Sequence, residues 1–198
     1  MHILIATTNP AKLAEIRKGL QTNLENSDIL TLDDVTIKGK PAETGKTFEE
    51  NAKIKAQFYG DQAHVPTIAD DGGLMIDALH GEPGVKSRRW PGYEATDEEL
   101  IDYALEKMQS VPEDERSATL STCLCFYDPQ KKTFLCEQEG IKGYIAQEPS
   151  GKETNGYPYR TLFVVKETGK YYDEMSNDHI TMNHRLIALK RLVKKIAQ

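Results

Sequence analysis

Strand-like and helix-like segments alternate through the first half of the sequence, and this order restricts the folds that the chain can adopt. Residues 2–7 (HILIAT) form a short apolar run typical of a buried strand, and residues 9–20 follow as a helix with Asn-Pro at its start. A second helix is predicted from Thr47, where Thr-Phe-Glu-Glu forms a capping box, and residues 67–70 are again strand-like. Such alternation is typical of an α/β protein.

The second half of the sequence shows a different pattern. A helix is predicted over 97–108, and two β-rich segments, 117–128 and 132–145, follow as antiparallel neighbours around a Pro-Gln-Lys-Lys turn. Residues 183–197 form a final helix whose inward face carries leucine, valine and isoleucine. We therefore expect an α/β fold with a mixed β-sheet and flanking helices.

Length and charge limit the kind of ligand. The 198 residues allow a sizeable core, as one large domain or two small lobes, and no linker-like segment interrupts them. The formal net charge of −6 argues against a general nucleic-acid-binding surface, although one positive pocket can still bind a small phosphorylated ligand. No apolar stretch approaches the roughly 18 residues that a membrane span needs, so we expect no membrane partner.

The cysteines indicate the compartment. There are three, and no export signal accompanies them, so we expect a cytoplasmic protein with reduced thiols. Cys123 and Cys125 share one face of a predicted strand, and only Cys136 is left to complete a metal site. Ordinary strand packing is therefore the preferred interpretation of these residues.

Two adjacent carboxylates, Asp70 and Asp71, follow the apolar run at 67–69 and precede Gly72 and Gly73. Like charges this close raise each other's pKa unless a positive charge lies between them. A divalent cation such as Mg²⁺ would supply that charge, and the glycines would let a phosphorylated ligand approach the backbone. The alternative is a surface turn with two exposed aspartates.

The turn from the first strand into the first helix contains Thr7, Thr8, Asn9 and Lys12. Free N–H groups at a helix start, polar side chains and a lysine in the first turn together favour a phosphate. The alternative is an ordinary helix cap beside a surface lysine. The stretch lacks the glycines of a Walker loop.

Three further groups are weaker candidates by themselves. Glu43 precedes the second predicted helix, on which Asn51 and Lys55 lie one turn apart. Tyr157, Tyr159 and Arg160 surround a proline and could stack on a base, although tyrosines before a strand also serve in packing. His184 and Arg185 open the final helix, where a cation is unfavourable unless an anion compensates it.

Taken in order, these stretches resemble the inosine triphosphate pyrophosphatase family, whose members hydrolyse deaminated purine nucleoside triphosphates (ITP, dITP and XTP) to the monophosphate and pyrophosphate. The segments that carry the resemblance are ATTNPAKLAEI (6–16), ETGKTFEENAKIKA (43–56) and ADDGGLMIDALHGEPGVKSRRW (69–90). The similarity covers nearly the whole chain. It implies an elongated, two-lobed fold over residues 1–198, with the active site in the cleft between the lobes, and a homodimer.

The resemblance also implies a role for each candidate residue. The triphosphate would be held by Thr7, Thr8, Asn9 and Lys12, with Gly72 nearby. Mg²⁺ would be bound by Glu43, Asp70 and Asp71. Asp71 would also be the general base, with Lys55 beside the phosphates. The base would be contacted by Tyr157, Tyr159, Arg160, His184 and Arg185.

The sequence departs from the family pattern mainly in the part that reads the base. Gly72 replaces a serine, and Pro158 and Arg160 replace the family's glycine and aspartate. A basic residue expected before the His-Arg pair falls near Asp178, and Asn183 replaces the serine before that pair. Because Arg160 is a donor where aspartate is an acceptor, the base preference could differ from the family's.

We therefore predict a Mg²⁺-dependent nucleoside triphosphate pyrophosphatase. Two alternatives remain open at this point. One is a pyrophosphatase of the Maf type that acts on another nucleotide, and the other is a nucleotide-binding protein without catalysis. Retention of Glu43, Lys55, Asp70 and Asp71 argues against the second alternative.

Overall fold

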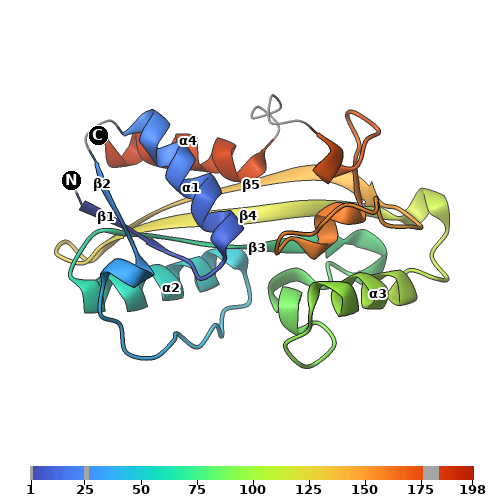
Figure 1. The fold of residues 1–198 in the computed structure, drawn as a ribbon, viewed down its shortest axis with the longest axis horizontal. Helices are drawn as coiled ribbons and strands as arrows, with labels where there is room; N and C mark the ends of the chain where they lie inside the picture. Colours follow the sequence, from blue (N-terminus) through green and yellow to red (C-terminus); the bar gives the residue numbers. More distant parts are fainter. Residues whose placement is uncertain (1, 25–26, 176–182) are drawn as a thin grey trace. The chain divides into compact units, whose positions relative to one another are not determined.

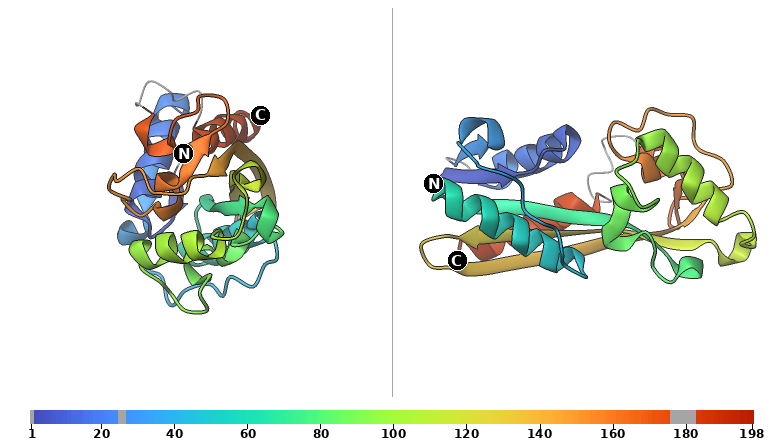
Figure 2. Two further views of the ribbon diagram at one scale, coloured as in Figure 1. Left: turned by 90° about the vertical axis from the view of Figure 1, so that its right-hand side faces the viewer. Right: turned by 90° about the horizontal axis from the view of Figure 1, so that it is seen from below.

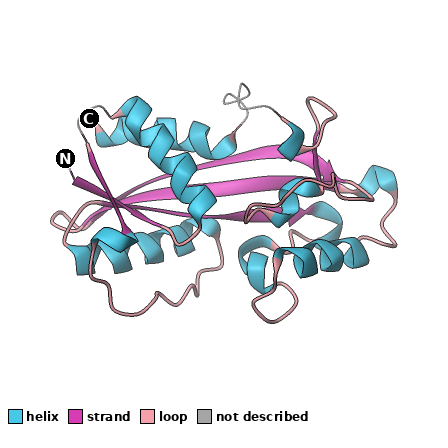
Figure 3. Ribbon diagram, viewed as in Figure 1, coloured by secondary structure: helices cyan, strands magenta, loops and turns pink. Residues whose placement is uncertain are grey.

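The computed structural model describes residues 2–24, 27–175 and 183–198. Within them, six strands form one sheet in the order β2-β1-β3-β4-β5-β6. Their bounds are β1 His2–Ala6, β2 Asp28–Thr31, β3 Thr67–Ile76, β4 Ser117–Asp128, β5 Thr133–Ile145 and β6 Phe163–Val165. β1 pairs in parallel with β2 and β3, whereas β5 and β6 are antiparallel, so the predicted mixed sheet is confirmed (Figure 3).

The α-helices of the described residues follow the sequence prediction closely. They are α1 Pro10–Asn23, α2 Phe48–Ala63, α3 Asp97–Lys107 and α4 His184–Ile196. Asn9 caps α1, and its side-chain oxygen accepts hydrogen bonds from the backbone N–H groups of Ala11 and Lys12. Thr47 caps α2 in the same manner, through the N–H of Glu50. None of the helices described is long and apolar enough to cross a membrane.

The chain divides into two compact units. Residues 1–71, 122–139 and 183–198 make the first, and residues 72–121 and 140–182 make the second. In the second, α3 and the strand ends enclose a core around Trp90, Leu100 and Phe163. The sequence-based expectation of an active site in a cleft between two lobes stays a prediction.

In the first unit, α1 and α4 cover one face of the strands and α2 covers the other (Figures 1 and 2). The apolar face predicted for α1 is confirmed, because Ile16 and Leu20 are fully buried. The two helices approach closely at Gly19, where an added Cβ would lie 2.5 Å from a methyl carbon of Leu189 on α4. This packing places the beginning of α4 beside α1 and thereby positions Arg185.

The Asp70-Asp71-Gly72-Gly73 segment differs from its sequence-based expectation. It was expected to be a turn, but β3 runs without interruption from Thr67 to Ile76 through all four residues. Asp and Gly favour turns locally, and the continuation of β3 beside β4 in the sheet outweighs that preference. The two aspartates are therefore buried strand residues instead of exposed turn residues.

The expectation of reduced cysteines is also wrong. Cys125 on β4 and Cys136 on β5 form a disulfide, since these neighbouring strands bring the two Cα atoms to 4.2 Å. Cys123 is a buried free thiol. Among the described residues there is no group of three or more His, Cys, Asp or Glu that could hold a metal ion.

Candidate functional site

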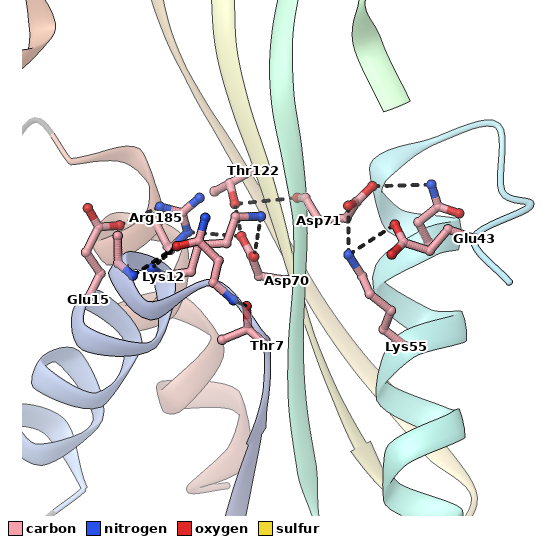
Figure 4. A network of polar contacts seen from close by, with 12 residues as sticks. Thr7, Lys12, Glu15, Glu43, Lys55, Asp70, Asp71, Thr122 and Arg185 are labelled. Atoms are coloured by element: carbon pink, nitrogen blue, oxygen red, sulfur yellow. Dashed lines mark hydrogen bonds and ion pairs between the residues drawn. The ribbon is translucent and has the colours of Figure 1, made fainter. Parts of the chain in front are cut away.

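The candidate site lies on both faces of β3, at the point where Asp70 and Asp71 follow each other (Figure 4). Successive side chains of a strand point to opposite faces of the sheet. Asp70 therefore faces α1 and α4, and Asp71 faces α2 (Figure 4). The expectation that one divalent cation is bound by both carboxylates stays a prediction. Each has cationic partners of its own.

Asp70 is the centre of a buried ion-pair cluster. Its Oδ1 lies 2.8 Å from the ammonium of Lys12, and its Oδ2 lies 3.0 Å from Nε of Arg185. The hydroxyl of Thr122 on β4 donates to Oδ2 over 2.8 Å. Burial alone would raise the pKa of Asp70, but the charges of Lys12 and Arg185 outweigh it and hold that pKa far below its usual range.

Arg185 also contacts α1, where its guanidinium forms an ion pair with Glu15. Both His184 and Arg185 are buried at the start of α4, which Asn183 caps through the N–H groups of Arg185 and Leu186. The carboxylates of Asp70 and Glu15 supply the anionic partners that the sequence analysis required for Arg185. Contact of these two residues with a base stays a prediction.

Glu15 is a site residue that the sequence analysis missed. It lies three positions after Lys12, so both side chains stand on one face of α1. That spacing could have indicated Glu15 as a partner of the site, but a glutamate within a helix is usually solvated. Only the packing of α4 on α1 gives it a buried partner.

The strand-to-helix turn at Thr7, Thr8 and Asn9 leads into α1 beside this cluster. The hydroxyl oxygen of Thr7 accepts from the N–H of Asn9, and Asn9 itself satisfies two N–H groups of the first turn. Thr8 is exposed. Its exposure and the nearby Lys12 suit an anion, and triphosphate binding by this turn stays a prediction.

On the other face of β3, Asp71 contacts α2. The Lys55 ammonium lies 2.8 Å from Oδ1 of Asp71 and 3.4 Å from Oε2 of Glu43, and therefore stands between two carboxylates. Nδ2 of Asn51 donates to Oδ2 of Asp71 over 3.3 Å. Asn51 and Lys55 thus share one face of α2, as their spacing predicted.

Burial and the charges on this face shift the pKa values of Asp71 and Lys55. Burial raises the pKa of Asp71, and the attraction of Lys55 only partly offsets that effect. Burial would lower the pKa of Lys55, but the carboxylates of Asp71, Asp70 and Glu43 outweigh it and raise that pKa. A carboxylate with a raised pKa is a stronger proton acceptor than an ordinary aspartate.

The predicted base-contacting loop belongs to the second unit. Arg160 stacks its guanidinium on the ring of Tyr157, 3.5 Å from the ring centroid, and also lies over Tyr172 at 4.8 Å. Tyr159 is buried, and its hydroxyl donates to the carbonyl of Ser87, which matches the packing alternative. Asp178 lies outside the described residues, and Gly72 belongs to β3.

Comparison with known proteins identifies relatives over nearly the whole length. The Ham1 family matches residues 3–195. A dITP/XTP pyrophosphatase of Corynebacterium efficiens is 36% identical, covering 100% of this chain and 98% of its own length. A dITP/XTP pyrophosphatase of Bacillus subtilis is 35% identical, with coverage of 96% and 94%.

A solved structure agrees with these sequence relatives. The HAM1 protein of Coxiella burnetii superimposes with a TM-score of 0.86 at 31% identity, covering 100% of this chain and 98% of that one. The mixed sheet with flanking helices is therefore shared with that structure, and the resemblance inferred from the motifs is confirmed.

Proposed function

We propose that this chain, which belongs to the Ham1 family, hydrolyses deaminated purine nucleoside triphosphates such as dITP and XTP to the nucleoside monophosphate and pyrophosphate. The names of relatives that match it over nearly its whole length support this activity. The observation that carries the mechanism is the buried carboxylate of Asp71, with Lys55 and Glu43 beside it.

The residues facing α2 fit a divalent cation. Glu43 and Asp71 present carboxylate oxygens on two sides of one ammonium, so this position already holds a positive charge. Carboxylates combined with substrate phosphates are the donors that Mg²⁺ prefers. When bound, the ion supplies positive charge that polarises the phosphoryl oxygens.

Asp70 fits the role of metal ligand less well than Glu43 and Asp71. Its carboxylate faces the opposite side of β3 and already has Lys12 and Arg185 as partners. We assign Asp70 the role of fixing these two cations, so that Lys12 stands beside the turn at Thr7, Thr8 and Asn9. A charge held in a fixed position needs no reorganisation when an anionic substrate arrives.

In the reaction, Asp71 accepts a proton from a water molecule as the water oxygen attacks the α-phosphorus. The bond from that phosphorus to the bridging oxygen breaks, and pyrophosphate leaves with the bond's electron pair. Lys55, which faces Asp71, stabilises negative charge on the phosphates. The polar turn at 7–12 binds the remaining phosphate oxygens.

We assign base recognition within the second unit to the loop of Tyr157 and Arg160, and a role of His184 and Arg185 of the first unit in contacting the base stays a prediction. A guanidinium only donates hydrogen bonds, so it favours a keto oxygen over an amino group. This property agrees with hypoxanthine and xanthine as bases, although Arg160 stands where the family has an acceptor. On the family resemblance we also propose a homodimer, and light scattering coupled to size exclusion tests it. A cytoplasmic location is a proposal from the sequence, and cell fractionation tests it.

The test of this function is pyrophosphate release from ITP, dITP, XTP, GTP, ATP, UTP and dTTP, with and without Mg²⁺. We expect turnover of the deaminated purines only with the metal, and loss of that turnover in Asp71→Asn. Asp102→Asn makes the same change on an exposed face of α3 and serves as the matched control. Full activity of Asp71→Asn at saturating Mg²⁺ refutes the mechanism, and turnover confined to a pyrimidine supports the Maf-type alternative.

A further inference from the structure

We propose that Asn51 is a positioning residue that fixes the carboxylate of Asp71 and the segment carrying Glu43 in one arrangement. The inference rests on the proposed function, because it assumes that Asp71 is the proton acceptor. Asn51 is only 1% exposed, and both ends of its side-chain amide have partners. Family resemblance gave this residue no role.

The orientation of the amide follows from its neighbours. The backbone N–H of Gly45 donates to Oδ1 of Asn51 over 2.8 Å, and a backbone N–H can only donate. The oxygen of the amide must therefore face Gly45, which directs the NH₂ group to Asp71. There Nδ2 lies 3.3 Å from Oδ2.

This orientation divides the two oxygens of Asp71 between two partners. Lys55 contacts Oδ1 and Asn51 contacts Oδ2. When Lys55 turns toward a phosphate, Asn51 still holds Oδ2, so the carboxylate keeps its direction during proton transfer. A hydrogen-bond partner that holds a metal-binding carboxylate typically contributes about 10- to 100-fold in metal affinity or activity, and the proposed function makes Asp71 such a carboxylate.

The same amide controls the approach of the Glu43 segment. An added Cβ on Gly45 would lie 2.6 Å from Oδ1 of Asn51 and 2.9 Å from its backbone nitrogen. Only glycine permits this close approach, and Gly45 lies two residues after Glu43. Asn51 therefore links the position of the proton acceptor to that of the second carboxylate beside Lys55.

The test compares Asn51→Asp with Asn51→Ala. Aspartate keeps the shape of the side chain and an oxygen that can accept from Gly45, but it has no NH₂ group and adds a like charge beside Asp71. Alanine loses both contacts. Gln57→Glu makes an amide-to-carboxylate change on the exposed face of α2 and is the control.

We expect kcat for dITP to fall about 10-fold or more in Asn51→Asp and in Asn51→Ala, with KM within about twofold of the wild type. Hydrogen exchange at the Gly45 amide should stay slow in Asn51→Asp and become fast in Asn51→Ala. This second measurement does not depend on catalysis, and it reports whether each variant is folded around the segment.

The results separate the possible roles. If Asn51→Asp protects the Gly45 amide and keeps wild-type kcat, Asn51 only anchors the segment and the proposal is wrong. An equal loss in Gln57→Glu also overturns it, because added charge on α2 then explains the effect. If Asp71→Asn is fully active, the mechanism under the proposed function has failed. If Asp71→Asn is inactive while Asn51→Asp is active, the proposal for Asn51 is refuted and the proposed function is not.

Discussion

The substitution Asp70→Asn removes one negative charge from the centre of β3 while it preserves the shape of the side chain. In the wild type this carboxylate is completely buried and lies within 3.0 Å of Lys12 Nζ and of Arg185 Nε. Asparagine keeps one acceptor oxygen, which can serve Arg185 or the hydroxyl of Thr122. Its NH₂ group then faces the ammonium of Lys12, donor against donor.

The expected loss in the free energy of unfolding follows from this geometry. Removing one member of a buried ion pair leaves the other charge without compensation and typically costs about 3–5 kcal/mol. Arg185 keeps Glu15 as a partner, so the uncompensated charge is mainly that of Lys12. We therefore expect the free energy of unfolding to fall by about 3 kcal/mol, the lower end of that range.

Urea unfolding followed by far-ultraviolet circular dichroism at pH 7 in EDTA measures this loss. Trp90 belongs to the second unit, so its fluorescence would not report directly on the first. The exposed substitution Asp102→Asn provides the baseline for removing a carboxylate. A loss below about 1 kcal/mol in Asp70→Asn would show that the cluster is not an energetic unit, and would refute the reasoning.

The stability lost in Asp70→Asn should depend on pH in a defined direction. The folded-state pKa of Asp70 lies below its unfolded value, so its contribution is fully present above the unfolded pKa, about 3.9, and is lost as the pH falls through the folded one. The difference between wild type and Asp70→Asn should therefore be constant from pH 8 to pH 5. A difference that shrinks within that interval contradicts the depressed pKa.

Three further predictions concern other parts of the first unit. The pH dependence expected at Asp71 is opposite to that at Asp70, because burial raises the folded-state pKa of Asp71. In EDTA, any stability that Asp71→Asn gains over the wild type should therefore shrink as the pH falls through that raised pKa. Equilibrium unfolding between pH 7 and pH 4 tests this. Lys55→Met removes the ammonium between Glu43 and Asp71, so the nucleotide-free protein should bind Mn²⁺ about tenfold more tightly in calorimetric titration, and unchanged affinity would count against metal binding there. Gly19→Ala places a Cβ 2.5 Å from a Leu189 methyl carbon, so overpacking should lower the free energy of unfolding by about 1–3 kcal/mol; a stabilised variant would mean that α1 and α4 separate easily.

The local elements of this protein were predictable from the sequence because local rules determine them. Asn9 and Thr47 cap helices where their spacing indicated, and Ile16 and Leu20 are buried where helical periodicity placed them. The order of motifs along the chain also identified the family. The caps and the buried faces need only near neighbours in the sequence, and the family needs only the motifs in their order.

The partners of the charged residues were decided by the tertiary structure. The sequence placed Asp70 and Asp71 side by side, but their separation onto opposite faces depends on β3 continuing through them as a strand of the sheet. Glu15 and Arg185 are 170 residues apart and meet only because α4 packs on α1. Sequence patterns carry little information on such contacts, since a long-range ion pair depends on the order of strands and the packing of helices. The sequence by itself therefore determined which groups can do chemistry, and the fold decided which charge each of them faces.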